Sequence, residues 1–204
     1  MFVRVSVPQK DAAPLSLAVT EWTPAMTPSL IKHLNGPDGT DVTRFLRNKV
    51  PQPYTEDDAR FFIALTAANG LFTAHAIVLL DNDSNIVETI GTVGLTFKDP
   101  TDIEAHSAEL GYWLSKAWWG KGIMSSVVCE YLDKVVRPLS IVPRNEQSAK
   151  LVKIIAYAIA DNAGSCKVLE NCGFALEGKM KQFAFKRHLV RWTAVRVLLV
   201  GLLQ

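Results

Sequence analysis

The chain has 204 residues, of which 49% are hydrophobic and 21% are charged, and its formal net charge is +2. This composition is that of a globular protein with a buried core. The net charge is too small to argue for a nucleic-acid or membrane-surface partner, and we expect neither. No stretch reaches the roughly 18 to 20 apolar residues of a membrane span. We therefore expect one domain over residues 1–204, existing as a monomer or homodimer.

The cysteines and histidines show no spacing typical of a metal site. Cys129, Cys166 and Cys172 form no CxxC or Cys/His pattern, and an odd cysteine count does not suggest a disulfide framework. The amino-terminal apolar run is too short for a signal peptide. We expect reduced thiols, no metal and a cytoplasmic location.

The first predicted elements are a strand over Leu15–Trp22 and a short helix from Pro28 that ends at Asn35-Gly36. Residues 36–53 show no clear periodicity of apolar residues, so no element is predicted there. Thr55 reads as the N-cap of a longer helix.

That longer helix has Asp58 at its third helical position and a stop signal at Asn69-Gly70. Phe61, Phe62 and Leu65 are predicted to form its buried side.

A hairpin and a further strand are predicted next. Residues 74–81 and 88–98 flank the turn-forming Asn82–Asn85, and "SAELGYWLS", residues 107–115, reads as a strand. From Gly122 onward, apolar residues recur at helical spacing, and Arg137-Pro138 is predicted to end this helix. The recurring residues are Met124, Val127, Val128, Tyr131, Leu132 and Val135.

The last third is predicted to contain a loop, a strand, a helix and two more strands. The loop covers residues 138–150 and the strand residues 153–161. The helix is capped by Asp161 or Asn162 and closes at Gly173. Strands and helices in this order suggest a mixed sheet covered by helices.

Gly120-Lys121-Gly122 lies where the strand gives way to the helix. Unpaired N–H groups and the helix dipole make such a junction an anion site. The P-loop does not fit, because Gly122 stands where Ser or Thr is required. The dinucleotide fingerprint fits poorly, because Ser125 replaces its third glycine and no parallel βαβ pattern surrounds it.

A third phosphate motif fits better. "GYWLSKAWWGKG" resembles the pyrophosphate loop of GCN5-related N-acetyltransferases, Gln/Arg-x-x-Gly-x-Gly/Ala, and in particular the ribosomal-protein N-terminal acetyltransferase branch. Asn162-x-x-Ser165, the following "CGF" and Glu177-Gly178 resemble a second motif of that branch. Ala117 departs from the Gln/Arg position. The resemblance covers about residues 53–199, and residues 1–52 are divergent.

The resemblance implies an α/β (α+β) fold whose central sheet is mixed, mostly antiparallel and six- to seven-stranded. Helices would cover both faces, and two parallel strands would splay apart. Acetyl-CoA is the implied cosubstrate, with its pantetheine arm on Trp113, Leu114 and Ser115. Its pyrophosphate would meet the N–H groups of Trp119, Gly120, Lys121, Gly122, Ile123, Met124 and Ser125. Asn162 is either a cofactor contact, an N-cap, or both.

Two residues are candidates for the chemistry of acetyl transfer. Glu109 is the candidate general base, and its alternative reading is a solvated strand residue or ion-pair partner. Ser165 is the candidate acid, because Leu169 stands where many family members carry Tyr; its alternative is a helix serine with local bonds. The implied acceptor is a primary amine, either a peptide or protein N-terminus or a small molecule. A non-catalytic acyl-CoA-binding module of the same fold is the alternative function.

Overall fold

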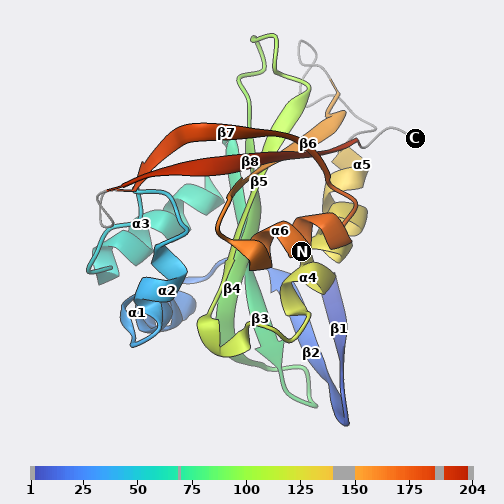
Figure 1. The fold of residues 1–204 in the computed structure, drawn as a ribbon. Coiled ribbons are helices and arrows are strands. Elements are labelled where there is room, and N and C mark those ends of the chain that lie inside the picture. Colours follow the sequence, from blue (N-terminus) through green and yellow to red (C-terminus); the bar gives the residue numbers. More distant parts are fainter. Residues whose placement is uncertain (1–2, 69, 140–149, 187–190, 202–204) are drawn as a thin grey trace. The chain divides into compact units, whose positions relative to one another are not determined.

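The computed structural model describes residues 3–68, 70–139, 150–186 and 191–201 (Figure 1). For residues 191 and 192 it describes the backbone alone. The eight strands follow the hydrogen-bonding order β1-β2-β3-β4-β5-β6-β8-β7. The chain divides into two compact units, Met1–Gly94 with Tyr112–Val127, and Leu95–Gly111 with Val128–Gln204. Each unit is described separately below.

The first unit holds the amino-terminal strands and three helices. Its complete elements are β1 (Val3–Gln9), β2 (Ala12–Thr20), α1 (Thr27–Asn35), α2 (Gly39–Thr43), α3 (Glu56–Ala67) and β3 (Phe72–Leu80). β1 pairs with β2 and β2 with β3, both antiparallel. The unit also contains most of β4 (Ile86–Phe97), the end of β5 (Ser107–Leu114) and the start of α4 (Ile123–Tyr131).

Strand β1 was not predicted from the sequence. Its Val3, Val5 and Val7 are buried and alternate with exposed Arg4 and Ser6, as on a half-buried strand. This strand raises the sheet to eight strands, above the six or seven expected.

Helix α3 begins with the predicted cap. The Thr55 side chain accepts a hydrogen bond from the Asp58 N–H, and the Asp58 carboxylate accepts one from the Thr55 N–H at 2.8 Å. This reciprocal pair is a capping box, which satisfies backbone donors that a helix start leaves open.

The predicted buried side of α3 was wrong for two of its three residues. Phe61 is 70% and Leu65 43% exposed, whereas Ala59 and Ile63 are buried. Phe62 packs against this core and meets Trp22 edge-on, with ring centroids 5.5 Å apart. Residues 59, 62 and 63 lie on one helical face by the i, i+3, i+4 rule, and Phe61 lies off it.

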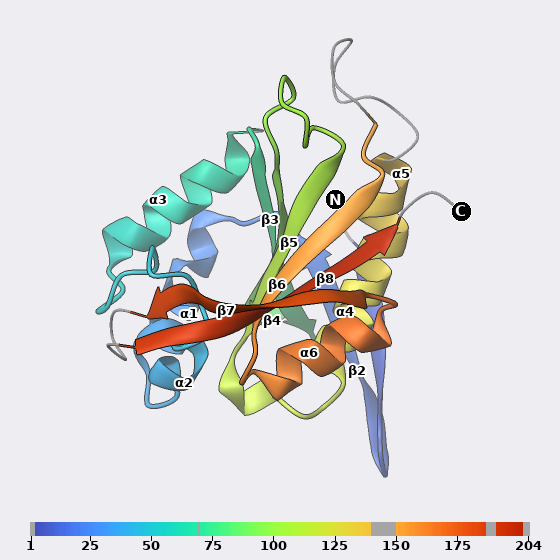
Figure 2. The same ribbon diagram turned by 45° about the horizontal axis from the view of Figure 1, so that its top comes forward.

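The second unit is built on four strands. β5 pairs with β6 (Lys153–Ile159) in parallel, β6 with β8 (Arg191–Gly201) antiparallel, and β8 with β7 (Ala175–Lys186) antiparallel. Figure 2 shows β6, β8 and β7 together with α6 (Ala163–Asn171). The predicted mixed, mostly antiparallel sheet and the two final strands are confirmed.

The helix that starts at α4 runs on beyond its predicted end. A π-helical turn at Leu132–Val136 leads into α5 (Arg137–Leu139), so Pro138 lies inside the helical stretch. The wider π-helical turn shifts the buried face of the helix by one residue. As a result, Val136 is fully buried and Val135 only partly. The predicted loop at residues 138–150 lies mostly outside the described residues.

Among the residues that the structure describes, no helix combines the length and apolarity needed to cross a bilayer. Nor do three or more histidine, cysteine or carboxylate groups gather there into a metal-binding cluster.

Candidate functional site

The end of β5 is held in the first unit by the neighbouring β4. The Ser115 N–H donates to the Ile90 carbonyl oxygen at 2.8 Å, so this N–H already has a sheet partner. A Cβ at Gly91 would lie 2.4 Å from the Trp113 carbonyl oxygen. Glycine at position 91 therefore lets the two strands approach closely.

A tight turn follows the strand and is fixed by its tryptophans. Lys116–Trp118 forms one 3-10 turn. The indole N–H of Trp119 then donates to the Leu114 carbonyl oxygen at 2.8 Å, back across the turn. The Lys121 ammonium lies 5.0 Å from the centre of the Trp118 ring, a cation–π distance.

Gly120 and Gly122 have φ of +73° and +74°, the left-handed region that glycine adopts without strain. Nothing lies within 4 Å of the position that a Cβ would take at either residue. Ile123 and Met124, which open α4, are buried, and the Ser126 N–H donates to the Gly122 carbonyl oxygen. The turn thus presents open backbone at a helix start, which fits a phosphate group.

A pocket of about 360 Å³ lies beside this turn, entirely within the first unit. It is lined by residues of α1, α2 and the segment between them, and by residues of β4 and the turn. The lining residues are Lys32, His33, Gly36, Pro37, Asp38, Gly39, Glu88, Ser115, Ala117, Trp118 and Lys121.

A charged cluster on the pocket wall was missed by the sequence reasoning. Glu88 on β4 forms an ion pair with Lys32, and its Oε1 lies 3.3 Å from Nε2 of His33. Burial lowers the pKa of His33, and the nearby Glu88 carboxylate opposes that shift. Helix α1 and strand β4 meet here, and His33 and Glu88 are 55 residues apart in sequence, so no local motif indicates the cluster.

Lys116 ties the turn to α2. Its ammonium lies 3.1 Å from Asp38 and 2.8 Å from Asp41. These hydrogen bonds raise the pKa of Lys116 and lower the pKa of Asp41. Lys116 precedes Ala117, where the related family carries Gln or Arg, and the sequence reasoning did not single it out.

Glu109 lies in the second unit, on the parallel part of β5. It is partly buried, and its register partner on β6 is Ile155. The parallel pairing runs from Ser107 to Leu110, and the strand continues to Leu114. Glu109 and Trp113 are therefore four residues apart on one continuous strand.

The second motif forms the start of α6. Asn162 is its N-cap, and its side-chain oxygen accepts a hydrogen bond of 3.0 Å from the Ser165 N–H. Ser165 is partly buried in the first helical turn. Leu169 is buried at 1% exposure, and its apolar side chain offers no hydroxyl. The structure thus brings Asn162 and Ser165 together and confirms the N-cap.

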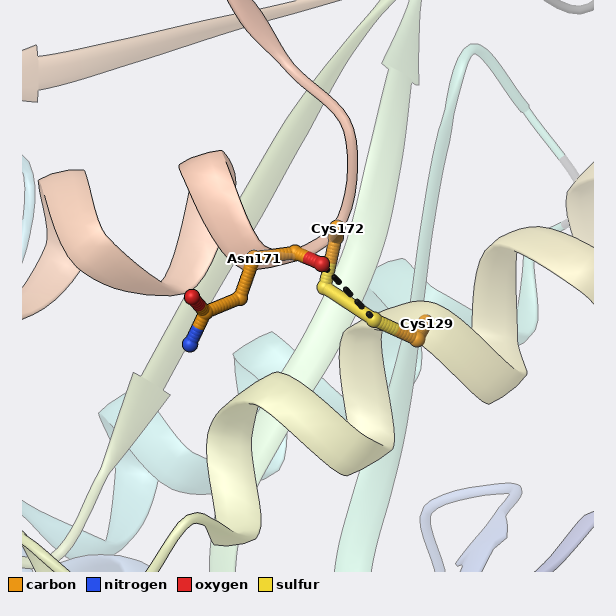
Figure 3. Close-up of a disulfide and its surroundings, with 3 residues drawn as sticks. All are labelled: Cys129, Asn171 and Cys172. Atoms are coloured by element: carbon orange, nitrogen blue, oxygen red, sulfur yellow. Dashed lines mark hydrogen bonds between the residues drawn. A yellow bond between two sulfur atoms is a disulfide. The ribbon is translucent and has the colours of Figure 1, made fainter.

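The disulfide between Cys129 and Cys172 corrects the expectation of reduced thiols. It joins α4 to the end of α6 with a Cα–Cα distance of 5.3 Å, within the usual range (Figure 3). The sulfur of Cys129 lies 4.0 Å from the Asn171 carbonyl oxygen. Only the dithiol form has an S–H to donate there. Cys166 remains a buried thiol, and burial raises its pKa.

A family comparison agrees with this geometry. The family model described as the acetyltransferase (GNAT) domain matches residues 17–175. The chain belongs to this family.

One curated protein is similar to the chain in sequence, and two solved structures are similar to it in fold. The chain is 30% identical over 98 residues to the ribosomal-protein-serine acetyltransferase of Escherichia coli, an alignment that spans 48% of each protein. Mycobacterium smegmatis RimJ, solved with CoA-disulfide, has a TM-score of 0.72 at 16% identity over 98% of this chain and 86% of that one. A GNAT-family acetyltransferase from Bacillus anthracis has a TM-score of 0.71 at 15% identity over 98% and 99%. Both structures share the fold.

Proposed function

We propose that the chain is an acetyl-CoA-dependent N-acetyltransferase that transfers the acetyl group directly to a primary amine in a ternary complex. The observation that carries this proposal is the turn with two left-handed glycines at the start of α4. Backbone N–H groups at a helix start and the helix dipole favour a pyrophosphate there. Family membership supplies the reaction class.

Acetyl-CoA would bind along β5 and the turn. Trp113, Leu114 and Ser115 would face the pantetheine arm, although the Ser115 N–H is already bonded to β4. The pyrophosphate would meet the turn and the first turn of α4, with Lys121 as an additional positive charge and Asn162 as a further contact. The pyrophosphate-binding residues proposed are Trp119, Gly120, Lys121, Gly122, Ile123, Met124 and Ser125. The Trp119 N–H already donates to the Lys116 carbonyl oxygen at 3.0 Å.

The reaction joins nitrogen to carbon and releases a thiol. The neutral amine attacks the thioester carbonyl carbon, the C–N bond forms, and the C–S bond breaks. Glu109 would take the proton that the amine loses, because aliphatic amines have pKa values near roughly 10 and are mostly protonated at neutral pH. Ser165 would relay a proton to the leaving thiolate. The products are the acetylated amine and CoA.

The proposed acceptor is a peptide or protein N-terminus or a small-molecule amine. The name of the Escherichia coli relative, a ribosomal-protein-serine acetyltransferase, supports a protein acceptor. One observation favours a second candidate, a non-catalytic acyl-CoA-binding module. Leu169 is buried and apolar where many family members place a Tyr acid.

We infer that the chain forms one domain over residues 1–204 and exists as a monomer or homodimer. It uses no metal, binds no nucleic acid or membrane, and has a cytoplasmic location. The Cys129–Cys172 bridge removes the cysteine argument for a reducing compartment. The cytoplasmic proposal therefore rests on the ribosomal substrate in the relative's name.

The test is turnover. The protein is incubated with acetyl-CoA and a panel of N-terminal peptides, polyamines and other small amines, and free thiol is measured. Amine-dependent thiol release supports the enzyme. If CoA raises the unfolding temperature but no amine is acetylated, the binding module is favoured. If CoA leaves the unfolding temperature unchanged, both proposals fail.

A further inference from the structure

Two aromatic rings stack on the surface of the second unit. Tyr157 on β6 and Phe183 on β7 have ring centroids 6.0 Å apart and planes inclined by 11°. They are 37% and 53% exposed. Because β8 lies between β6 and β7 in the sheet, the pair reaches over a strand and leaves apolar surface open to solvent.

An irregularity of β7 places Phe183 in this position. The β7–β8 register shifts between Met180 and Ala184, and Gln182 inside this bulge has φ of +52°. Ala184 pairs with Thr193, so regular alternation would turn Phe183 to the opposite face. The bulge instead aims it at Tyr157. Such bulges are common beside active sites, where they redirect a side chain.

The aromatic pair lies on the same face of the sheet as Glu109. Register partners share a face, and Glu109 pairs with Ile155, two residues before Tyr157. Tyr157 is also the first β6 residue beyond the last parallel pair, Leu110 with Ala156. Strand geometry puts the Cα atoms of Glu109 and Tyr157 about 8 Å apart.

Helix α6 is associated with the other face. Arg196 on β8 pairs with Ala158, the neighbour of Tyr157, so its side chain lies on the opposite face. The Arg196 guanidinium interacts with the Cys166 thiol of α6. The face that carries Glu109 and the two rings is therefore separate from the face of the Asn162 helix.

We propose that Tyr157 and Phe183 form a docking platform for the first side chains of an extended N-terminal peptide, whose α-amino group points to Glu109. This inference rests on the proposed function. An extended chain advances about 3.3 Å per residue, so about 8 Å corresponds to two or three residues. A peptide with apolar side chains at its start can cover both rings. A small amine at Glu109 would be too short to do so.

The experiment compares acceptors in Phe183→Ala and Tyr157→Ala. Two peptides of equal length and charge are used, one beginning Leu-Phe and the other Gly-Gly, together with a small diamine. Each variant should lower kcat/KM about tenfold for the Leu-Phe peptide, mainly through KM. The losses for the Gly-Gly peptide and the diamine should stay within about threefold. Tyr157→Phe, which keeps the ring, should retain most activity on the Leu-Phe peptide.

Leu176→Ala provides the matched control, because Leu176 is also on β7 and is 57% exposed. It should leave kcat/KM for all three acceptors unchanged, and CoA should raise the unfolding temperature of every variant by the same amount as that of the wild type. Equal losses for all three acceptors, or no loss for the Leu-Phe peptide, would overturn the platform. So would a wild-type dimer that Phe183→Ala converts to monomers, since the face would then bind a second copy. A wild type that acetylates no amine would instead overturn the proposed function.

Discussion

The indole N–H of Trp119 donates a 2.8 Å hydrogen bond to the Leu114 carbonyl oxygen, five residues earlier. This bond closes the chain between the end of β5 and the glycine turn, so it holds the proposed phosphate site in shape. Trp119→Phe keeps an aromatic ring but removes the donor. A hydrogen bond contributes about 0.5–1.5 kcal/mol, so we expect KM for acetyl-CoA to rise about two- to tenfold. Steady-state kinetics at saturating amine would check this, and an unchanged KM would argue that the bond does not shape the site.

The second prediction concerns Gly122, whose φ is +74°. Left-handed backbone costs a residue with a Cβ about 1–2 kcal/mol, so Gly122→Ala should distort the turn and raise KM for acetyl-CoA about five- to thirtyfold. Calorimetric titration with CoA should show a matching loss of affinity. Gly70→Ala is the control, because a Cβ at Gly70 also meets open space and this position lies outside the turn. Wild-type affinity in Gly122→Ala would contradict a role for the left-handed turn.

The turn could be predicted because its chemistry is local. At Gly120 and Gly122 the residue type alone indicates a left-handed backbone, and the capping pair of Thr55 and Asp58 is equally local. Strand β1 was equally readable, since "VRVSV" alternates at the period of a strand.

Other features depend on contacts that no short window contains. The π-helical turn at Leu132–Val136 shifts the buried face, and a strict 3.6-residue period then selects Val135 in place of Val136. The Cys129–Cys172 bridge requires two helices to approach across 43 residues of sequence. A cysteine count carries no such information.

The third prediction tests Glu109 as the general base. Glu109→Gln keeps the shape of the side chain and removes its basicity. A general base contributes about 10²–10⁴-fold where the amine is protonated, so kcat/KM near pH 7 should fall about a hundredfold or more. The loss should shrink above the pKa of the acceptor, about 8 for a peptide α-amino group and about 10 for a small aliphatic amine, because the amine is then largely neutral without assistance. A pH profile parallel to that of the wild type would exclude Glu109 as the base.

The fourth prediction concerns the disulfide between Cys129 and Cys172. Cross-linking residues 43 apart restricts the unfolded chain, and the chain-entropy model gives a stabilisation of up to about 4 kcal/mol. Reductant should therefore lower the unfolding temperature of the wild type and have no effect on a Cys129→Ser, Cys172→Ser double variant. Thiol titration of the denatured, unreduced protein should find only Cys166 reactive. Three reactive thiols would show that the bridge is not formed.

The fifth prediction is a pH dependence of stability that arises at His33. Burial lowers the pKa of His33 from its ordinary value of 6.5 in the folded protein. Below pH 6.5 the unfolded chain therefore binds a proton more readily than the folded protein does, and protonation favours unfolding. The contribution of neutral His33 to the free energy of unfolding is fully present above pH 6.5. It is lost as the pH falls towards the pKa of His33 in the folded protein.

Urea unfolding between pH 5 and 7.5 would measure this effect against His33→Gln, which does not titrate. The free energy of unfolding of the wild type should fall more steeply with decreasing pH than that of the variant. Carboxylates remote from His33 titrate alike in both proteins, so their contribution cancels in the difference, and the burial that lowers the pKa of His75 likewise affects both. Glu88 contacts His33 directly, so the difference reports the His33–Glu88 pair. A direct NMR titration of His33 should have its midpoint below 6.5. A midpoint above 6.5 would mean that the Glu88 carboxylate outweighs burial, and the wild type would then be the protein that loses less stability in acid.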